Sequence, residues 1–356
     1  MNYTKLDVHT AAPLHPEASV LLIYTGGTLG MVYDISGKHL IPFNFDQILN
    51  RVPELQQINV LLTVLTLNEP IDSSNISIEH WLELAHIIEE HYNFYDGFVI
   101  LHGTDTMSYT ASALSYLLEN LAKPVILTGA QVPIGKVRND ARFNLISALE
   151  IAAKGGVEGS THVPEVAIYF DNVLLRGNRT KKVESSHFDA FKSDNYPPLA
   201  VAGIELEFEP LHILPNPEKP LKVHRKLDNR VAILKLFPGI SEMVVRCLLS
   251  NRNLRGLVLE TYGSGNAPTA DWFLKLLREA IANGLIILNV SQCDEGDVKQ
   301  GLYETSRYLE EMGVIGGADI TTEAAITKLM FVLGQDLTVE ESKKMLRDNL
   351  RGEISL

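Results

Sequence analysis

Short apolar runs alternate with longer segments of helical periodicity along most of this chain. The runs 20–24, 60–67, 97–101, 125–127 and 166–170 have the length and composition of buried strands. Apolar residues recur at helical spacing in the segment that begins near Ser77, and again over 107–119 and 143–153. This order predicts a parallel sheet with helices on its faces.

The alternation stops between residues 197 and 229, where six prolines and scattered charges replace the periodic apolar pattern. It resumes with runs over 231–237, 257–262 and 285–290, and we expect helices from Ser241 and from Ala270. The sequence therefore predicts two α/β domains, over 1–200 and 229–356, with a linker over 201–228.

Composition narrows the classes of function. The 356 residues include 31 Lys and Arg against 44 Asp and Glu, a net charge of −13, which argues against nucleic acid or an anionic membrane as partner. The start of the chain has no apolar core of signal-peptide length, and no later run is long enough to span a bilayer, so we expect a cytoplasmic enzyme. Cys247 and Cys293 are too few for a disulfide framework, and the 11 histidines show no metal-ligand spacing.

Two threonine-rich motifs follow predicted strands, TGGTLG at 25–30 and HGTDTM at 102–107. Strand ends of a parallel sheet are where ligands bind. The first motif fits neither the dinucleotide fingerprint nor the P-loop, so it does not predict a phosphate site. It places Thr28 on a tight turn whose small neighbours let a substrate approach. An ordinary glycine turn with a capping threonine is the alternative.

The second motif holds more polar groups than a helix cap requires. Thr104 or Asp105 alone would suffice as an N-cap, yet both stand here between His102 and Thr106. A hydroxyl nucleophile is weak and needs a partner that manages its proton. A lysine beside a carboxylate can do this, so the sequence favours hydroxyl-based catalysis.

The chain resembles the type I, cytoplasmic bacterial L-asparaginases along nearly its whole length. Besides the two threonine motifs, the resemblance rests on Asp72-Ser73-Ser74, RGNRTKK at 176–182, YGSGNAP at 262–268 and GGAD at 316–319. It implies hydrolysis of L-asparagine to L-aspartate and ammonia without a cofactor. It also implies a larger N-terminal parallel-sheet domain, a smaller C-terminal domain, and a homodimer or homotetramer.

The resemblance implies a role for each site residue. Thr28 corresponds to the nucleophile that forms an acyl-enzyme ester. Thr104, Asp105 and Lys182 correspond to a second triad that moves protons and positions water, and the family leaves open which threonine attacks. On the residues alone, Lys182 beside Lys181 also fits an ordinary surface lysine.

Other matching positions concern the substrate. The loop Asp72-Ser73-Ser74 corresponds to the one that grips the α-carboxylate and α-amino groups, and Asp105 is suited to hold the ammonium. Asn266 matches an asparagine that reaches toward the active site across the subunit interface. Without the resemblance, Asp72-Ser73-Ser74 is also typical of a turn before a helix.

Two positions depart from the family pattern. The mobile lid tyrosine of the family falls at Leu40, and Tyr33 is the nearest tyrosine, so neither is assigned to that role. Some type I enzymes bind asparagine at a second, regulatory site near a cysteine that matches Cys293. The arginine of that site corresponds to Glu260 here, which argues against allosteric activation.

Two other hypotheses compete with an asparaginase. One is an amidohydrolase that prefers glutamine, including the related subunit of a tRNA-dependent amidotransferase. That subunit carries an extra N-terminal domain, whereas the first predicted strand here begins at Val20. The other is a non-catalytic amino-acid sensor, which would have no need for the full set of Thr28, Thr104, Asp105 and Lys182.

Overall fold

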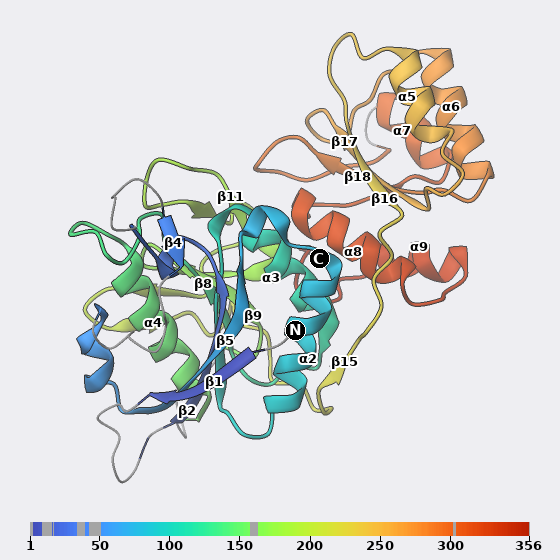
Figure 1. Cartoon of the computed structure of the whole chain (residues 1–356). Coiled ribbons are helices and arrows are strands. Elements are labelled where there is room, and N and C mark those ends of the chain that lie inside the picture. Colours follow the sequence, from blue (N-terminus) through green and yellow to red (C-terminus); the bar gives the residue numbers. More distant parts are fainter. Residues whose placement is uncertain are drawn as a thin grey trace. The chain divides into compact units, whose positions relative to one another are not determined.

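The computed structural model describes residues 3–8, 16, 18–33, 40–42, 51–156, 163–301 and 304–355. The chain divides into two compact units, residues 1–224 and 225–356 (Figure 1). Each unit is a β-sheet covered by helices, and the first is the larger. The prediction of two α/β domains, the N-terminal one larger, is confirmed.

Nine of the described strands form one sheet in the first unit. In spatial order they are β1 (Tyr3–Val8), β5 (Val60–Ile71), β2 (Ala18–Gly26), β6 (Gly97–Leu101), β8 (Val125–Thr128), β9 (Val166–Phe170), β10 (Val173–Arg176), β13 (Ala200–Ala202) and β14 (Leu206–Phe208). The strands from β5 to β9 are parallel, whereas β1 and the strands from β10 onward are antiparallel. The predicted parallel sheet is therefore its centre.

The change of direction after β9 has a local cause. Asp171 and Asn172 have φ values of 45° and 68°, which make the two-residue turn of a β-hairpin. Aspartate and asparagine tolerate this left-handed conformation better than most residues. The antiparallel edge of the sheet begins at this turn.

Three long helices cover the central strands, α2 (Ile78–His91), α3 (Met107–Leu117) and α4 (Ala141–Ala153). Figure 1 shows α4 on one face of the sheet and α2 and α3 on the other. Val20 and Leu22 belong to the core that includes α4, and Leu21 and Ile23, which point the opposite way, are equally buried. Since both faces of these strands are covered, their side chains are mostly apolar, and polar side chains are found beyond the strand ends.

Short elements complete the first unit. The 3-10 turns are η1 (Thr28–Gly30), η3 (Pro53–Gln57), η4 (Ser73–Asn75), η5 (Thr104–Thr106), η6 (Lys154–Gly156) and η7 (Gly177–Arg179). Small antiparallel pairs are β3 (Met31–Tyr33) with β4 (Leu40–Pro42), β7 (Leu118–Glu119) with β15 (Lys222–Val223), and β11 (Lys181–Lys182) with β12 (Phe191–Lys192).

The segment 201–228, expected as a linker, contributes strands to the first unit. The strand β14 extends the large sheet through β13, and β15 pairs with β7. Strands of two or three residues are too short to show an apolar period, which is why the sequence pattern did not reveal them. The boundary between the compact units falls after His224.

The second unit is a parallel sheet with helices on both faces. Its strands, in order, are β16 (Val231–Lys235), β17 (Gly256–Thr261), β18 (Ile286–Ser291) and β19 (Ile315–Gly316). Its helices are α5 (Glu242–Leu249), α6 (Asp271–Ala282), α7 (Glu304–Glu311), α8 (Thr322–Leu333) and α9 (Val339–Arg347). Strand and α6 side chains share one core, and α8 packs on β17 and its neighbours. None of the described helices is both long and apolar enough to cross a membrane.

Candidate active site

The two threonine motifs lie side by side at one edge of the large sheet. Their strands, β2 and β6, are parallel neighbours paired from Val20 to Tyr24, so both motifs leave the sheet at the same edge. The strand β5 pairs with β2 on the other side and leads into Asp72. Three loops that are distant in sequence therefore start from adjacent strand ends.

Glycines bring these three loops into close contact. A Cβ on Gly27 would lie 2.6 Å from the Gly103 nitrogen, and one on Gly103 would lie 2.5 Å from the Ser73 hydroxyl oxygen. These separations are too short for a real Cβ atom, so glycine is required at both positions. Thr106 Oγ also donates to the Ser73 carbonyl at 2.7 Å. Gly103 is thus the point where all three loops meet.

Thr28 begins the short turn η1 directly after Gly27. Gly27 has φ 86°, and Thr28 itself is half-buried. Tyr24, at the end of β2, is buried and donates from its hydroxyl to the Gly30 carbonyl at 3.1 Å. Burial raises the pKa of Tyr24, so the phenol keeps its proton. The turn that carries Thr28 is therefore fixed by glycine geometry on one side and by Tyr24 on the other.

Lys182 reaches Thr104 and Asp105 from β11. Its Nζ lies 2.8 Å from Thr104 Oγ and 2.6 Å from Asp105 Oδ1. The Lys182 side chain is 17% exposed and that of Asp105 is 68% exposed. The structure thus brings together three of the residues that the sequence predicted as catalytic. An ammonium beside a hydroxyl oxygen stabilises negative charge that develops on that oxygen.

Gln131 is a site residue that the sequence analysis missed. Thr104 Oγ donates to Gln131 Oε1 at 3.3 Å, and Gln131 Nε2 donates to the His187 carbonyl at 3.1 Å. The backbone nitrogen of Gln131 donates to Asp140 Oδ2 at 2.8 Å. Gln131 follows the strand β8, which is the next parallel neighbour of β6. A polar residue soon after Gly129 at a third strand end was the available sequence signal.

The loop after β5 is held by its own side chains. Asp72 Oδ1 accepts from the backbone nitrogen and from the hydroxyl of Ser74, both at 2.9 Å. These hydrogen bonds lower the pKa of Asp72, so the carboxylate is an anion at neutral pH. Asp72 is the N-cap of η4, and Ser73 is 5% exposed. The capping role and a substrate-binding role are compatible here, because the capped loop lies against Gly103.

The remaining predicted residues belong to the second unit or lie outside the described side chains. Asn266 belongs to the second unit, where it is half-buried and exchanges backbone hydrogen bonds with Tyr262.

Glu260, in the same unit, accepts from the Thr322 hydroxyl at 2.7 Å and lies 3.4 Å from Lys235 Nζ. Cys293 is exposed. The side chains of Leu40 and Tyr33, on which the lid question depends, lie outside the described residues.

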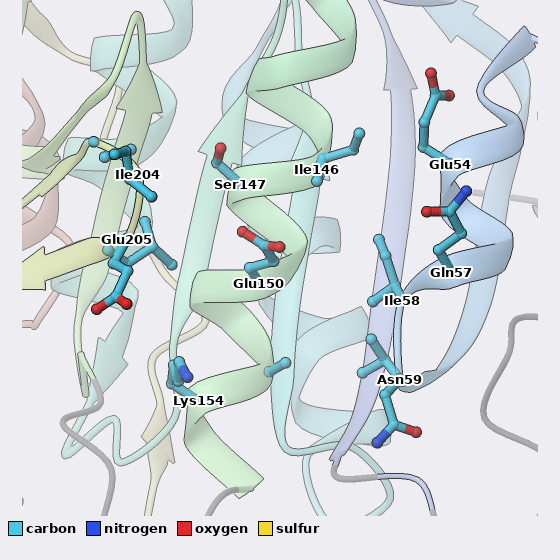
Figure 2. A pocket seen from close by; sticks show the side chains of 15 residues that line it. Glu54, Gln57, Ile58, Asn59, Ile146, Ser147, Glu150, Lys154, Ile204 and Glu205 are labelled. Carbon is cyan, nitrogen blue, oxygen red and sulfur yellow. The ribbon is translucent and has the colours of Figure 1, made fainter.

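A separate cavity lies away from these loops. It has a volume of about 720 Å³ and opens between η3, α4 and the β13–β14 hairpin. Figure 2 shows its lining, in which Glu54, Glu150 and Glu205 contribute carboxylates and Lys154 an amine. None of the predicted catalytic residues lines it. Among the side chains that the structure describes, no group of three His, Cys, Asp or Glu residues is arranged to hold a metal ion.

Comparisons with known proteins agree with this geometry. Residues 19–212 match the family described as "Asparaginase, N-terminal", and residues 230–346 match "Glutaminase/Asparaginase C-terminal domain". L-asparaginase 1 of Escherichia coli K12 is 43% identical over 340 residues, which cover 95% of this chain and 98% of that protein. The 60 kDa lysophospholipase of Mus musculus is 40% identical over 97% of this chain and 64% of its own length. The crystal structure of L-asparaginase I from Vibrio cholerae superposes with a TM-score of 0.86 at 38% identity, covering 95% of this chain and 99% of that one.

Proposed function

The chain belongs to the asparaginase family and hydrolyses L-asparagine to L-aspartate and ammonia, and we propose that Thr28 is the nucleophile of this reaction. The contact of Gly27 with Gly103 carries the proposal, because it sets the turn of Thr28 beside the loop of Thr104. A threonine on a glycine turn at a strand end leaves room for the substrate amide. The buried Tyr24 phenol holds that turn in place.

The reaction proceeds through an acyl-enzyme. Thr28 Oγ attacks the carbon of the side-chain carboxamide, the C–N bond breaks, and the nitrogen leaves as ammonia after taking up a proton. A water molecule then attacks the ester carbon, releases L-aspartate and returns the proton to Thr28. The two steps together consume one water and produce one ammonia. Side chains and backbone donors suffice for this acyl transfer, so no cofactor is needed.

Thr104, Asp105 and Lys182 move protons and position water. Asp105 keeps the Lys182 ammonium in place, and Lys182 donates to Thr104 Oγ. With its own proton directed at Gln131, the Thr104 hydroxyl has a defined orientation. A hydroxyl oriented in this way beside a cation is suited to guide a water molecule or a proton at the reacting carbonyl.

Further residues bind the ends of the substrate. We expect Asp72, Ser73 and Ser74 to bind the α-carboxylate and α-amino groups, with Asp105 contributing to the ammonium site.

Asn266 of one subunit completes the site of another, which makes the enzyme a homodimer or a homotetramer. It acts in the cytoplasm and, with its net charge of −13, does not bind nucleic acid or an anionic membrane.

The proposal is tested by ammonia release from L-asparagine and from L-glutamine, with Thr28→Ala and Thr28→Ser as matched variants. Wild-type protein should release ammonia from asparagine, Thr28→Ala should not, and Thr28→Ser should retain part of the rate because it keeps the hydroxyl. Circular dichroism should show the same fold for all three, since Thr28 is only half-buried. Retained turnover in Thr28→Ala would assign the attack to another group.

The same assay, together with the effect of asparagine on the melting temperature as a measure of binding, separates the alternatives. A faster release from glutamine would indicate an amidohydrolase that prefers glutamine. Asparagine and glutamine differ by one methylene, which contributes about 1–3 kcal/mol to discrimination between substrates. Binding of asparagine without any ammonia release would indicate a sensor.

A further inference from the structure

His102 is a buried histidine directly beside the point where the three site loops meet. It follows β6 and is 1% exposed. Its Nδ1 lies 2.7 Å from the Gly103 carbonyl oxygen, and its Nε2 lies 3.0 Å from Thr110 Oγ on α3. Trp81, on α2, places its indole nitrogen 2.9 Å from the same Thr110 oxygen. A series of hydrogen bonds therefore runs from α2 and α3, through the His102 ring, to Gly103.

A neutral His102 gives this series of hydrogen bonds a consistent arrangement of protons. A carbonyl oxygen only accepts, so Nδ1 of His102 carries the hydrogen that it donates to Gly103. An indole N–H only donates, so Thr110 Oγ accepts from Trp81, and with a neutral ring the threonine proton points at Nε2. The ring nitrogens, the Thr110 hydroxyl, the Trp81 N–H and the Gly103 carbonyl all have hydrogen-bond partners when the imidazole is neutral and protonated on Nδ1. Burial lowers the pKa of His102 to about 4, which agrees with a neutral ring.

The carbonyl that His102 holds belongs to the peptide bond that leads into Thr104. A peptide unit is planar and trans, so fixing the Gly103 carbonyl also fixes the direction of the Thr104 N–H and the position of its Cα. Gly103 has no side chain to restrain its backbone, and glycine is the most flexible residue type. The hydrogen bond from His102 therefore restrains this peptide in addition to the packing of Gly103 against Gly27 and Ser73.

We propose that His102 is a positioning residue for the hydrolysis: its Nδ1–H orients the Gly103–Thr104 peptide and thereby holds the Thr104 hydroxyl against Lys182. The inference rests on the proposed roles of Thr104 and Lys182. It assigns no contact with the substrate to His102.

Three substitutions at this position separate hydrogen bonding from packing. In His102→Asn, the amide nitrogen takes the place of Nδ1 and still donates to Gly103. In His102→Gln, the amide lies near the place of Nε2, so the bond to Gly103 is lost while that to Thr110 remains. His102→Leu loses both. If the role were only to fill space, asparagine, the smallest of the three, would be the most harmful.

The expected result is the opposite order. We expect kcat to fall on the order of ten- to a hundredfold in His102→Gln and His102→Leu, with KM changing much less, because a small displacement of a catalytic group reduces the chemical step. His102→Asn should keep kcat within about threefold of wild type. An equal kcat in the Asn and Gln variants, or a lower one in the Asn variant, would overturn the proposal.

Two controls keep the result interpretable. Lys182→Met is assayed in parallel: if it retains activity, the proposed mechanism itself fails, whereas its inactivity together with equal Asn and Gln variants refutes only the role of His102. Thr110→Val serves if the His102 variants do not fold, since it keeps the ring and its bond to Gly103 but removes the hydroxyl that contacts both Nε2 and Trp81. A reduced kcat at unchanged KM in Thr110→Val supports positioning through the ring, and an unchanged kcat contradicts it.

Discussion

The backbone of Gly27 lies against the backbone of Gly103, with no room for a Cβ atom between them. Gly27 precedes the proposed nucleophile Thr28, and Gly103 precedes Thr104, the residue bound by Lys182. The relative position of the two threonines therefore depends on a contact between two residues that have no side chain. Neither motif alone would set the position of one threonine relative to the other.

We predict that Gly27→Ala disrupts the site. The new Cβ would collide with Gly103 and would also sit on a backbone with φ 86° and ψ 171°, a conformation essentially confined to glycine that costs about 1–3 kcal/mol for another residue. Turnover of asparagine should fall on the order of a hundredfold as the loops move apart. Gly284→Ala is the matched control, because Gly284 has φ 92° but open space around it. It should lower the free energy of unfolding in urea because of its positive φ, and it should keep its kcat; a kcat loss in Gly284→Ala as large as in Gly27→Ala would refute the collision argument.

A second prediction concerns the charge on Lys182. Lys182→Met keeps the length of the side chain and removes the ammonium that contacts Thr104 and Asp105. We expect kcat for asparagine to fall about 10²–10⁴-fold, the usual contribution of a positioned proton-transfer group. Lys192→Met, an exposed lysine on the partner strand β12, should leave kcat unchanged. Near-wild-type activity in Lys182→Met would remove Lys182 from the mechanism.

Much of the architecture could be predicted from the apolar runs. Those of β2, β6 and β9 are buried on both faces, so composition and length were sufficient signals. The strands β13, β14 and β15 were missed because they are two or three residues long and lie in a proline-rich segment. Their position depends on pairing with distant strands, which a local pattern does not report.

The site was predictable to a different extent. The sequence identified the residues around Thr104 and Asp105, and the resemblance pointed to Lys182, but neither gave the contact between them. Gln131 was missed because a single glutamine after a strand is not distinctive, and it becomes a site residue only through the hydrogen bond from Thr104. The role we infer for His102 likewise depends on Thr110 and Trp81, which lie on two helices.

A third prediction is a hyperbolic dependence of rate on asparagine concentration. The resemblance implies that some type I enzymes have a regulatory site with an arginine where this chain has Glu260, and that carboxylate is engaged by Thr322 and Lys235. A carboxylate there does not attract the carboxylate of an amino-acid effector, since like charges repel. Initial rates over a wide concentration range test this, with Glu260→Gln as a variant that retains the acceptor for Thr322. A sigmoidal curve for the wild type would show that a regulatory site operates despite Glu260.

A fourth prediction concerns the pH dependence of stability. The pKa of His102 is lowered from 6.5 to about 4 in the folded protein, so between these values the unfolded chain binds a proton that the folded chain does not. The contribution of His102 to the free energy of unfolding is therefore fully present above pH 6.5, and it is lost as the pH falls toward 4. At 1.36 kcal/mol per pKa unit the shift corresponds to about 3 kcal/mol.

Urea unfolding of wild type and of His102→Asn at a series of pH values measures this effect. Asparagine has no titrating group, and neither Trp81 nor Thr110, the partners of the ring, titrates in this range. The free energy of unfolding of the wild type should therefore decline more steeply between pH 6.5 and 4 than that of the variant, by about 3 kcal/mol in total. Parallel curves for the two proteins would mean that His102 accepts a proton on Nε2 in the folded state, and the ring would then donate to Thr110 instead of accepting from it.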